Sequence, residues 1–158
     1  MGIEKERKFL VKGNKVPAFV KNNVKSKKIV QGYLMLSGKE QLRVRVIDNQ
    51  RAYICYKKGI SKTEKLEFEY EIPVVDALEL LKQCSIKVKK TRWSYTDVYR
   101  NTIDMDYYPG INVIVVEVEY RGEKLLDNHI PVFCSGEITG QSLFSNMNLG
   151  ILQSIGKD

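Results

Sequence analysis

Residues 112–121 read NVIVVEVEYR, and apolar and acidic side chains alternate along this stretch. Successive side chains on a β-strand point to opposite faces, so the alternation is typical of a strand with one apolar and one charged face. Residues 41–47, QLRVRVI, repeat the pattern with Arg43 and Arg45 as the charges. In both segments the apolar face needs cover from other parts of the chain. The pattern therefore predicts a sheet.

Most of the remaining chain predicts further strands joined by turns. Ser37-Gly38-Lys39 and Pro109-Gly110 are typical hairpin turn signals. We predict helices over residues 73–84 and 142–155, and a loop or a short helix over 13–28. The predicted strands cover residues 2–12, 29–36, 41–47, 51–57, 63–72, 86–100, 101–108 and 112–121. About eight strands of this length predict a mainly β (α+β) fold, either a closed antiparallel barrel or a sandwich.

The composition limits the settings in which the protein works. The chain has 158 residues, a net charge of +7 and 43% hydrophobic residues, which fits a single globular domain over residues 1–158. No apolar run reaches the ~20 residues of a membrane helix, so we expect no membrane segment. Three widely spaced cysteines oppose a disulfide framework and a zinc site, and they favour a reduced, cytoplasmic setting. The positive charge suggests an anionic partner: nucleic acid, an acidic membrane surface or a phosphorylated small molecule.

Nearly every predicted strand carries two charges that lie two residues apart, and the signs are segregated by strand. Glu67, Glu69 and Glu71 make one strand acidic, whereas Lys90 and Arg92 make another basic. If helices cover the apolar outer face, the charged face points into a barrel. Burying so many charges without partners would be very costly. A water-filled interior that holds metal ions and a polyanion would remove that cost, because carboxylates bind hard cations and Arg and Lys bind phosphate oxygens.

A series of short motifs follows the strands from residue 3 to about residue 120. They are Glu4-Lys5-Glu6-Arg7-Lys8 (an ExExK signature), Gln31-Gly32-Tyr33-Leu34, Leu42-Arg43-Val44-Arg45, Lys57, Glu69-Tyr70-Glu71-Ile72, Lys90-Thr91-Arg92, Asp106 with Tyr108 and Gly110, and Val116-Glu117-Val118-Glu119. In combination and in this order, the motifs resemble the CYTH domains, or triphosphate tunnel metalloenzymes. That superfamily includes inorganic triphosphatases, thiamine triphosphatases and class IV adenylate cyclases. The resemblance implies an eight-stranded antiparallel barrel that forms a tunnel, with a few peripheral helices.

The resemblance also implies a role for each matching residue in a reaction that uses Mg²⁺ or Mn²⁺. Glu4, Glu6 and Glu119 would bind the metal that grips the triphosphate. Asp106 would orient a basic neighbour or assist metal binding. The other implied roles are phosphate binding by Lys8, Arg43, Arg45, Lys57 and Arg92, a second metal or the attacking water at Glu69, Glu71 and Glu117, proton transfer or leaving-group stabilisation by Lys90, and substrate contact by Tyr33.

One segment, residues 138–146, departs from the family pattern. Gln141 stands where an acidic residue is expected and Leu143 where a basic one is expected, whereas Asn146 matches. In the family the basic residue comes from a helix that helps to close the tunnel. Its loss removes one phosphate contact, so a changed substrate or a weakened activity stays open.

Three functions are compatible with these residues. The favoured one is a metal-dependent hydrolase of triphosphate-containing substrates, above all inorganic tripolyphosphate, in which a metal-activated water attacks. A class IV-type adenylate cyclase is an alternative, although the sequence reveals no adenine pocket. A non-catalytic module that binds polyphosphate or RNA is another, but motifs typical of RNA-binding domains are absent, so we do not expect nucleic acid. His129 is the only histidine, which opposes a histidine-centred site, and a homodimer stays open.

Overall fold

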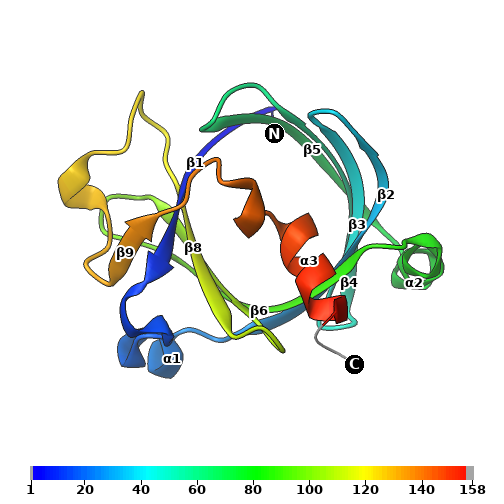
Figure 1. The fold of residues 1–158 in the computed structure, drawn as a ribbon, viewed down its shortest axis with the longest axis horizontal. Helices are drawn as coiled ribbons and strands as arrows, with labels where there is room; N and C mark the ends of the chain where they lie inside the picture. Colours follow the sequence, from blue (N-terminus) through cyan, green and yellow to red (C-terminus); the bar gives the residue numbers. More distant parts are fainter. Residues whose placement is uncertain (1, 156–158) are drawn as a thin grey trace.

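An antiparallel barrel forms most of the computed structural model, which describes residues 2–155 (Figure 1). Neighbouring strands follow the order β5-β4-β3-β2-β6-β7-β8-β1, and β1 returns to β5 to close the ring. The predicted eight-stranded barrel is thus confirmed over the sandwich. Its strands are β1 (Gly2–Val11), β2 (Lys27–Ser37), β3 (Glu40–Ile47), β4 (Arg51–Gly59), β5 (Glu64–Ile72), β6 (Lys87–Thr96), β7 (Thr102–Tyr108) and β8 (Val113–Glu119).

A ninth strand, β9 (Cys134–Glu137), pairs with the C-terminal part of β1. The sequence did not predict it, because its four residues show no alternation of apolar and polar side chains. The helices are α1 (Ala18–Asn23), α2 (Val74–Gln83) and α3 (Asn146–Ile155), with 3₁₀ turns at Lys12–Asn14, Asp127–His129 and Ser142–Phe144. The predicted helix over 142–155 is therefore shorter. It begins after Ser145, whose Oγ accepts a hydrogen bond from the Asn148 backbone N–H at 3.2 Å.

Helices and loops cover the apolar outer face of the barrel, as the alternation predicted. On one side, α2 packs Ala77 and Leu81 against Val44 and Val46 of β3. On the other side, α1 and the segment before β9 cover β1, β7 and β8 (Figure 1). Burying a side chain such as valine or leucine contributes about 1.5–3 kcal/mol, so these two clusters stabilise the barrel from outside. The second cluster comprises Phe9, Val11, Val20, Ile103, Met105, Ile114, Val116, Val118, Tyr120, Leu125 and Cys134.

Helix α3 lies across one end of the barrel (Figure 1). Its Leu149 is buried against Val88 of β6 and Tyr108 of β7, which face inward. Gly150 allows the close approach, since a Cβ at this position would lie 2.6 Å from the Lys87 carbonyl oxygen. The inner face is therefore apolar beside α3, and its charged residues lie further along the same strands.

The structure also bears on the expectation about membranes. Among the described residues, no helix has both the length and the apolar composition that a membrane crossing requires.

Candidate active site

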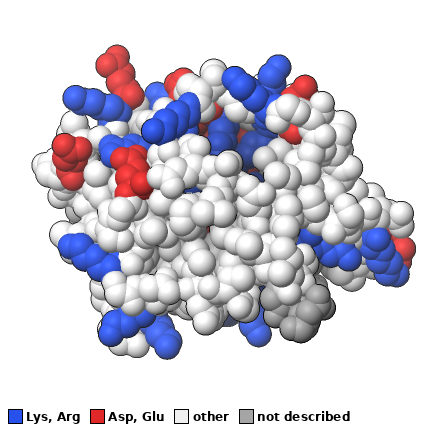
Figure 2. All heavy atoms as spheres, viewed as in Figure 1, with Lys and Arg blue, Asp and Glu red and all other residues white. Residues whose placement is uncertain are grey.

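The inward faces of the strands enclose a cavity of about 550 Å³. In Figure 2, basic side chains lie inside and around a hollow near the top of the view. The lining residues come from most of the barrel strands, so the topology gathers motifs that lie far apart in the sequence. Those that the sequence predicted are Glu4, Glu6, Lys8, Tyr33, Arg43, Arg45, Lys57, Arg92, Glu117 and Glu119.

Two predicted acidic residues of β5 lie outside this cavity. The Glu71 side chain is 52% exposed and pairs with Arg51 at 2.8 Å. Glu69 lines a smaller neighbouring cavity and lies 3.8 Å from Arg45. Every second residue of a strand shares a face, so the sequence predicted that Glu69 and Glu71 lie on the same face as Glu67. Glu67 does line the main cavity. Their positions differ because the pairing of β5 with β1 ends at Glu67, and the residues beyond it pair with β4 alone.

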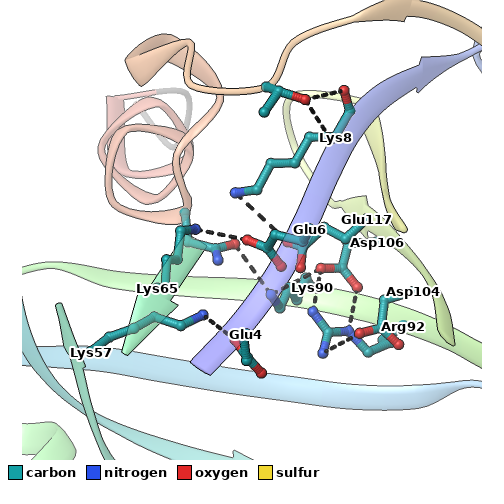
Figure 3. Close-up of polar contacts among 12 residues, drawn as sticks. Glu4, Glu6, Lys8, Lys57, Lys65, Lys90, Arg92, Asp104, Asp106 and Glu117 are labelled. Atoms are coloured by element: carbon teal, nitrogen blue, oxygen red, sulfur yellow. Dashed lines mark hydrogen bonds and ion pairs between the residues drawn. The ribbon is translucent and has the colours of Figure 1, made fainter. Parts of the chain in front are cut away.

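Lys90 and Asp106 do not line the cavity, although they share the inward strand faces with Arg92 and Asp104, and they form a buried ion cluster with Arg92 (Figure 3). Lys90 Nζ is 2.9 Å from Asp106 Oδ2, and neither side chain is exposed. Arg92 donates two further hydrogen bonds to the Asp106 carboxylate, at 2.6 and 2.8 Å. Burial disfavours the charge on Asp106, but Arg92 and Lys90 outweigh it and lower the pKa of this carboxyl. Asp106 thus fixes two basic side chains in place.

Burial destabilises the charged form of Lys90. Burial lowers the pKa of Lys90 to about 7, since Asp106 only partly offsets the loss of hydration and the repulsion from Arg92. A lysine with such a pKa can exchange a proton near neutral pH.

Glu117 is the acidic centre of the wall formed by β1, β7 and β8. Its Oε1 lies 3.8 Å from Lys8 Nζ, and it faces Asp104 across β7 and β8. Burial would raise the pKa of Glu117, but the surrounding cations, Lys8 and Arg92 foremost, hold it well below its ordinary value. The Glu117 carboxylate therefore stays ionised inside the barrel.

Crowded carboxylates lie next to this wall, where β1 meets β5. Glu4 and Glu67 approach one another closely enough to share a hydrogen bond, and Lys57 Nζ lies 3.6 Å from Glu4 and 3.4 Å from Glu67. Burial and the bond to Glu67 raise the pKa of Glu4 to about 8. Such a crowd of carboxyl oxygens offers the ligand atoms that a hard cation prefers.

Arg43 and Arg45 form the basic side of the cavity on β3. Burial, together with repulsion from Arg43 and Arg92, lowers the pKa of Arg45 to about 10. Gln31 Oε1 accepts a hydrogen bond from Arg45 Nε at 3.2 Å. The Nε of Arg43 is buried and has no hydrogen-bond partner among the described residues. This concentration of guanidinium groups suits a ligand with several anionic oxygens.

Sequence reasoning missed several lining residues. Lys65 donates a 2.7 Å hydrogen bond to Glu6, and the alternation along β5 could have found it because it shares a face with Glu67. The motifs also gave no role to Glu67 or to Asp104, although both follow the same alternation. Thr139, Gly140, Ser142 and Ser145 reach the cavity from a loop where no strand pattern applies, beside Gln141 and Asn146 of the segment that the family pattern had singled out.

The comparisons with known proteins agree with this geometry. The model of the CYTH domain family matches residues 2–127. The chain belongs to the CYTH domain family. A CYTH relative, the inorganic triphosphatase of Acetivibrio thermocellus, is 31% identical over 153 residues, which cover 94% of each protein.

Solved structures share the CYTH fold described above. The crystal structure of an inorganic triphosphatase superimposes with a TM-score of 0.63 at 24% identity, covering 94% of this chain and 97% of that one. A protein from Pyrococcus horikoshii OT3 gives a TM-score of 0.60 at 25% identity, over 77% of this chain and 80% of that one. The first of these structures shares the fold over 94% of this chain, which is more than the residues 2–127 that the family model matches.

The C-terminal wall of this CYTH domain is electrically neutral. Gln141 lines the cavity and donates a 3.4 Å hydrogen bond to the Glu137 carbonyl. Leu143, which stands where a basic residue is expected, is 59% exposed and does not line the cavity. The C-terminal residues on this wall therefore offer amide and hydroxyl groups to a ligand, and the cation beside them is Lys62, which lies between β4 and β5, packs against Gly140 and also lines the cavity.

Proposed function

We propose that this CYTH protein hydrolyses triphosphate-containing substrates, above all inorganic tripolyphosphate, with the help of a divalent cation, Mg²⁺ or Mn²⁺. The observation that carries the proposal is the meeting of crowded carboxylates and three arginines, Arg43, Arg45 and Arg92, in one cavity of about 550 Å³. The first set suits a hard cation, and the second suits phosphate oxygens. The relationship to an inorganic triphosphatase at 31% identity supports the substrate.

Glu4, Glu6 and Glu119 are the residues that we expect to hold the cation. Glu6 and Glu119 lie directly opposite one another on β1 and β8. Burial, Asp104 and Glu6 together raise the pKa of Glu119, so this carboxyl also resists ionisation without a cation beside it. A divalent cation bound there would neutralise phosphate charge and lower the pKa of a bound water.

The basic residues would hold the substrate in line for attack. Lys8, Lys57 and the arginines of the cavity wall donate to phosphate oxygens, and the ionised Glu117 carboxylate orients the attacking water by accepting a hydrogen bond from it. Tyr33, which is 6% exposed, contacts the substrate from β2. Asp106 acts by holding Lys90 and Arg92, and Lys90 stabilises the negative charge of the leaving phosphate. We assign no contact with the substrate to Glu71 or Glu69.

The cavity offers little for a nucleoside. Among the described residues that line it, Tyr33 alone carries an aromatic ring. A purine is normally held by stacking and by polar groups along its edge, and such a platform is not formed here. The lining therefore favours an inorganic substrate over the ATP of an adenylate cyclase.

Phosphate release from tripolyphosphate and from ATP, each with Mg²⁺ and with Mn²⁺, tests the proposal. We expect release from tripolyphosphate, and a loss of at least about 100-fold in Glu6→Gln, because a metal ligand contributes several kcal/mol to transition-state stabilisation. Glu71→Gln is the matched control, since it removes one carboxylate outside the cavity, and it should retain activity. Binding of tripolyphosphate without turnover would instead indicate a binding module, and formation of cyclic AMP from ATP a cyclase.

A further inference from the structure

Asn146 connects the neutral wall of the cavity to the buried ion cluster. It is the first residue of α3 and lines the cavity. Its Oδ1 accepts a hydrogen bond from Lys90 Nζ at 3.2 Å and another from the Tyr108 hydroxyl. The Lys90 side chain is fully buried and Tyr108 is 1% exposed. Asn146 thus links α3 to the buried ion cluster.

These contacts determine which way the amide of Asn146 points. An ammonium group has only donors to offer, so the oxygen of the amide has to face Lys90. The hydrogen bonds found for the Asn146 side chain among residues 2–155 both use this oxygen. The Nδ2 group is on the other branch of the planar amide and keeps its two donors. Because Asn146 lines the cavity, these donors are available to a ligand there.

We infer that Asn146 contacts the substrate, donating from Nδ2 to a phosphate oxygen while its Oδ1 holds Lys90 in position. The inference rests on the proposed function, since it takes the ligand to be a triphosphate. In this arrangement Asn146 supplies a hydrogen-bond donor on the side of the cavity where the basic residue expected at Leu143 is missing. A hydrogen bond to a charged phosphate group changes affinity by about 10- to 100-fold.

Two variants separate the two roles of Asn146. Asn146→Asp keeps oxygens for Lys90 and Tyr108 but replaces the Nδ2 donors with a carboxylate oxygen. Asn146→Leu is of similar size and removes both the donor and the acceptor. Asn148→Asp is the matched control, because it adds the same charge to the same helix at a residue that does not line the cavity.

Titration calorimetry with tripolyphosphate in EDTA measures binding without turnover, and phosphate release with Mg²⁺ then gives kcat and KM. In Asn146→Asp we expect Kd and KM to rise at least about 10-fold with a small change in kcat. In Asn146→Leu we expect the same weaker binding together with a lower kcat, because Lys90 loses its acceptor. Unchanged binding in Asn146→Asp would overturn the inference, and so would an equal loss in Asn148→Asp. Asn146→Ser, which keeps a smaller polar group, replaces the leucine variant if that one does not fold.

The same measurements distinguish a failure of this inference from a failure of the proposed function. If the parent protein hydrolyses tripolyphosphate but Asn146→Asp binds it normally, only the role of Asn146 is wrong. If the parent protein binds tripolyphosphate without hydrolysing it and Asn146→Asp weakens that binding, the contact stands and the hydrolase proposal fails.

Discussion

The Lys90 ammonium lies 2.9 Å from the Asp106 carboxylate inside the barrel wall, and neither side chain reaches solvent. Arg92 completes the cluster with two hydrogen bonds to Asp106. A buried carboxylate between two cations is hard to replace, since its removal leaves both cations without their counter-charge. We therefore expect the cluster to be a structural requirement of the barrel.

We expect Asp106→Asn to lower the free energy of unfolding by about 3–5 kcal/mol, the usual cost of breaking a buried ion pair. Urea denaturation followed by circular dichroism measures the change. Glu71→Gln is the control, because it breaks a pair with Arg51 that is more than half exposed on both sides, and it should leave the unfolding midpoint nearly unchanged. Equal effects in the two variants would mean that the buried cluster adds no special stability.

Acid should weaken a second ion pair, which joins β1 to β9. Arg7 donates two hydrogen bonds to Glu137, at 2.7 and 2.8 Å, and this bonding lowers the pKa of Glu137 to about 2. Because the pKa is lower in the folded protein, the contribution to stability is complete above about pH 4.5, the ordinary value, and is lost as the pH falls towards 2. The Glu137 side chain is 39% exposed, so screening by solvent keeps the contribution small.

Thermal unfolding of Glu137→Gln beside the parent protein tests this dependence on pH. The parent should be the more stable at pH 7, and the difference between their melting temperatures should shrink between pH 4.5 and pH 2. A difference that stays constant down to pH 2 would show that the carboxylate charge of Glu137 does not carry the effect.

The three cysteines should be unreactive in the folded protein. Cys55, Cys84 and Cys134 are free and buried. Burial raises the pKa of each thiol, to about 11 for Cys55 and about 12 for Cys134, so thiolate is scarce at pH 8. A thiol reagent at pH 8 is expected to modify all three in urea and none in buffer. Fast modification in buffer would indicate that the barrel opens locally around the modified residue.

The strands of the barrel were predictable from the sequence because the information for them is local, whereas their closure into a barrel rather than a sandwich was implied only by the family resemblance. Alternation along β3 and β8 identifies strands, and short turns between them favour antiparallel neighbours. The same alternation placed Arg43 and Glu117 on the inner face, as the structure has them. The spacing of charges within one strand is enough to assign these side chains to a face. Their placement could therefore be predicted without knowing which residues they contact.

The other features of the site depend on contacts between distant parts of the chain, which the pattern within a single strand does not indicate. Glu71 follows the alternation of Glu67, yet it lies outside the cavity because β5 runs past the point where its pairing with β1 ends. Asn146 reaches Lys90 only through the packing of α3 on the barrel, and the two residues lie 56 positions apart in the sequence. Register between distant strands and the docking of a terminal helix are set by tertiary packing, which a single sequence does not reveal.

The docking of α3 can be tested at Gly150, where the helix comes closest to β6. A Cβ there would lie 2.6 Å from the Lys87 carbonyl oxygen and 3.1 Å from Val88 Cβ, and neither atom belongs to a flexible side-chain end. Gly150→Ala should therefore push α3 away from β6, lower the free energy of unfolding by about 1–3 kcal/mol and move Asn146 from Lys90. Gly136→Ala is the control, because a Cβ on this exposed residue of β9 meets nothing within 4 Å. Thermal unfolding and tripolyphosphate hydrolysis should both be impaired in Gly150→Ala alone. A Gly150→Ala protein with normal stability and activity would mean that α3 can shift without disturbing the cavity, and that its contact with Lys90 is dispensable.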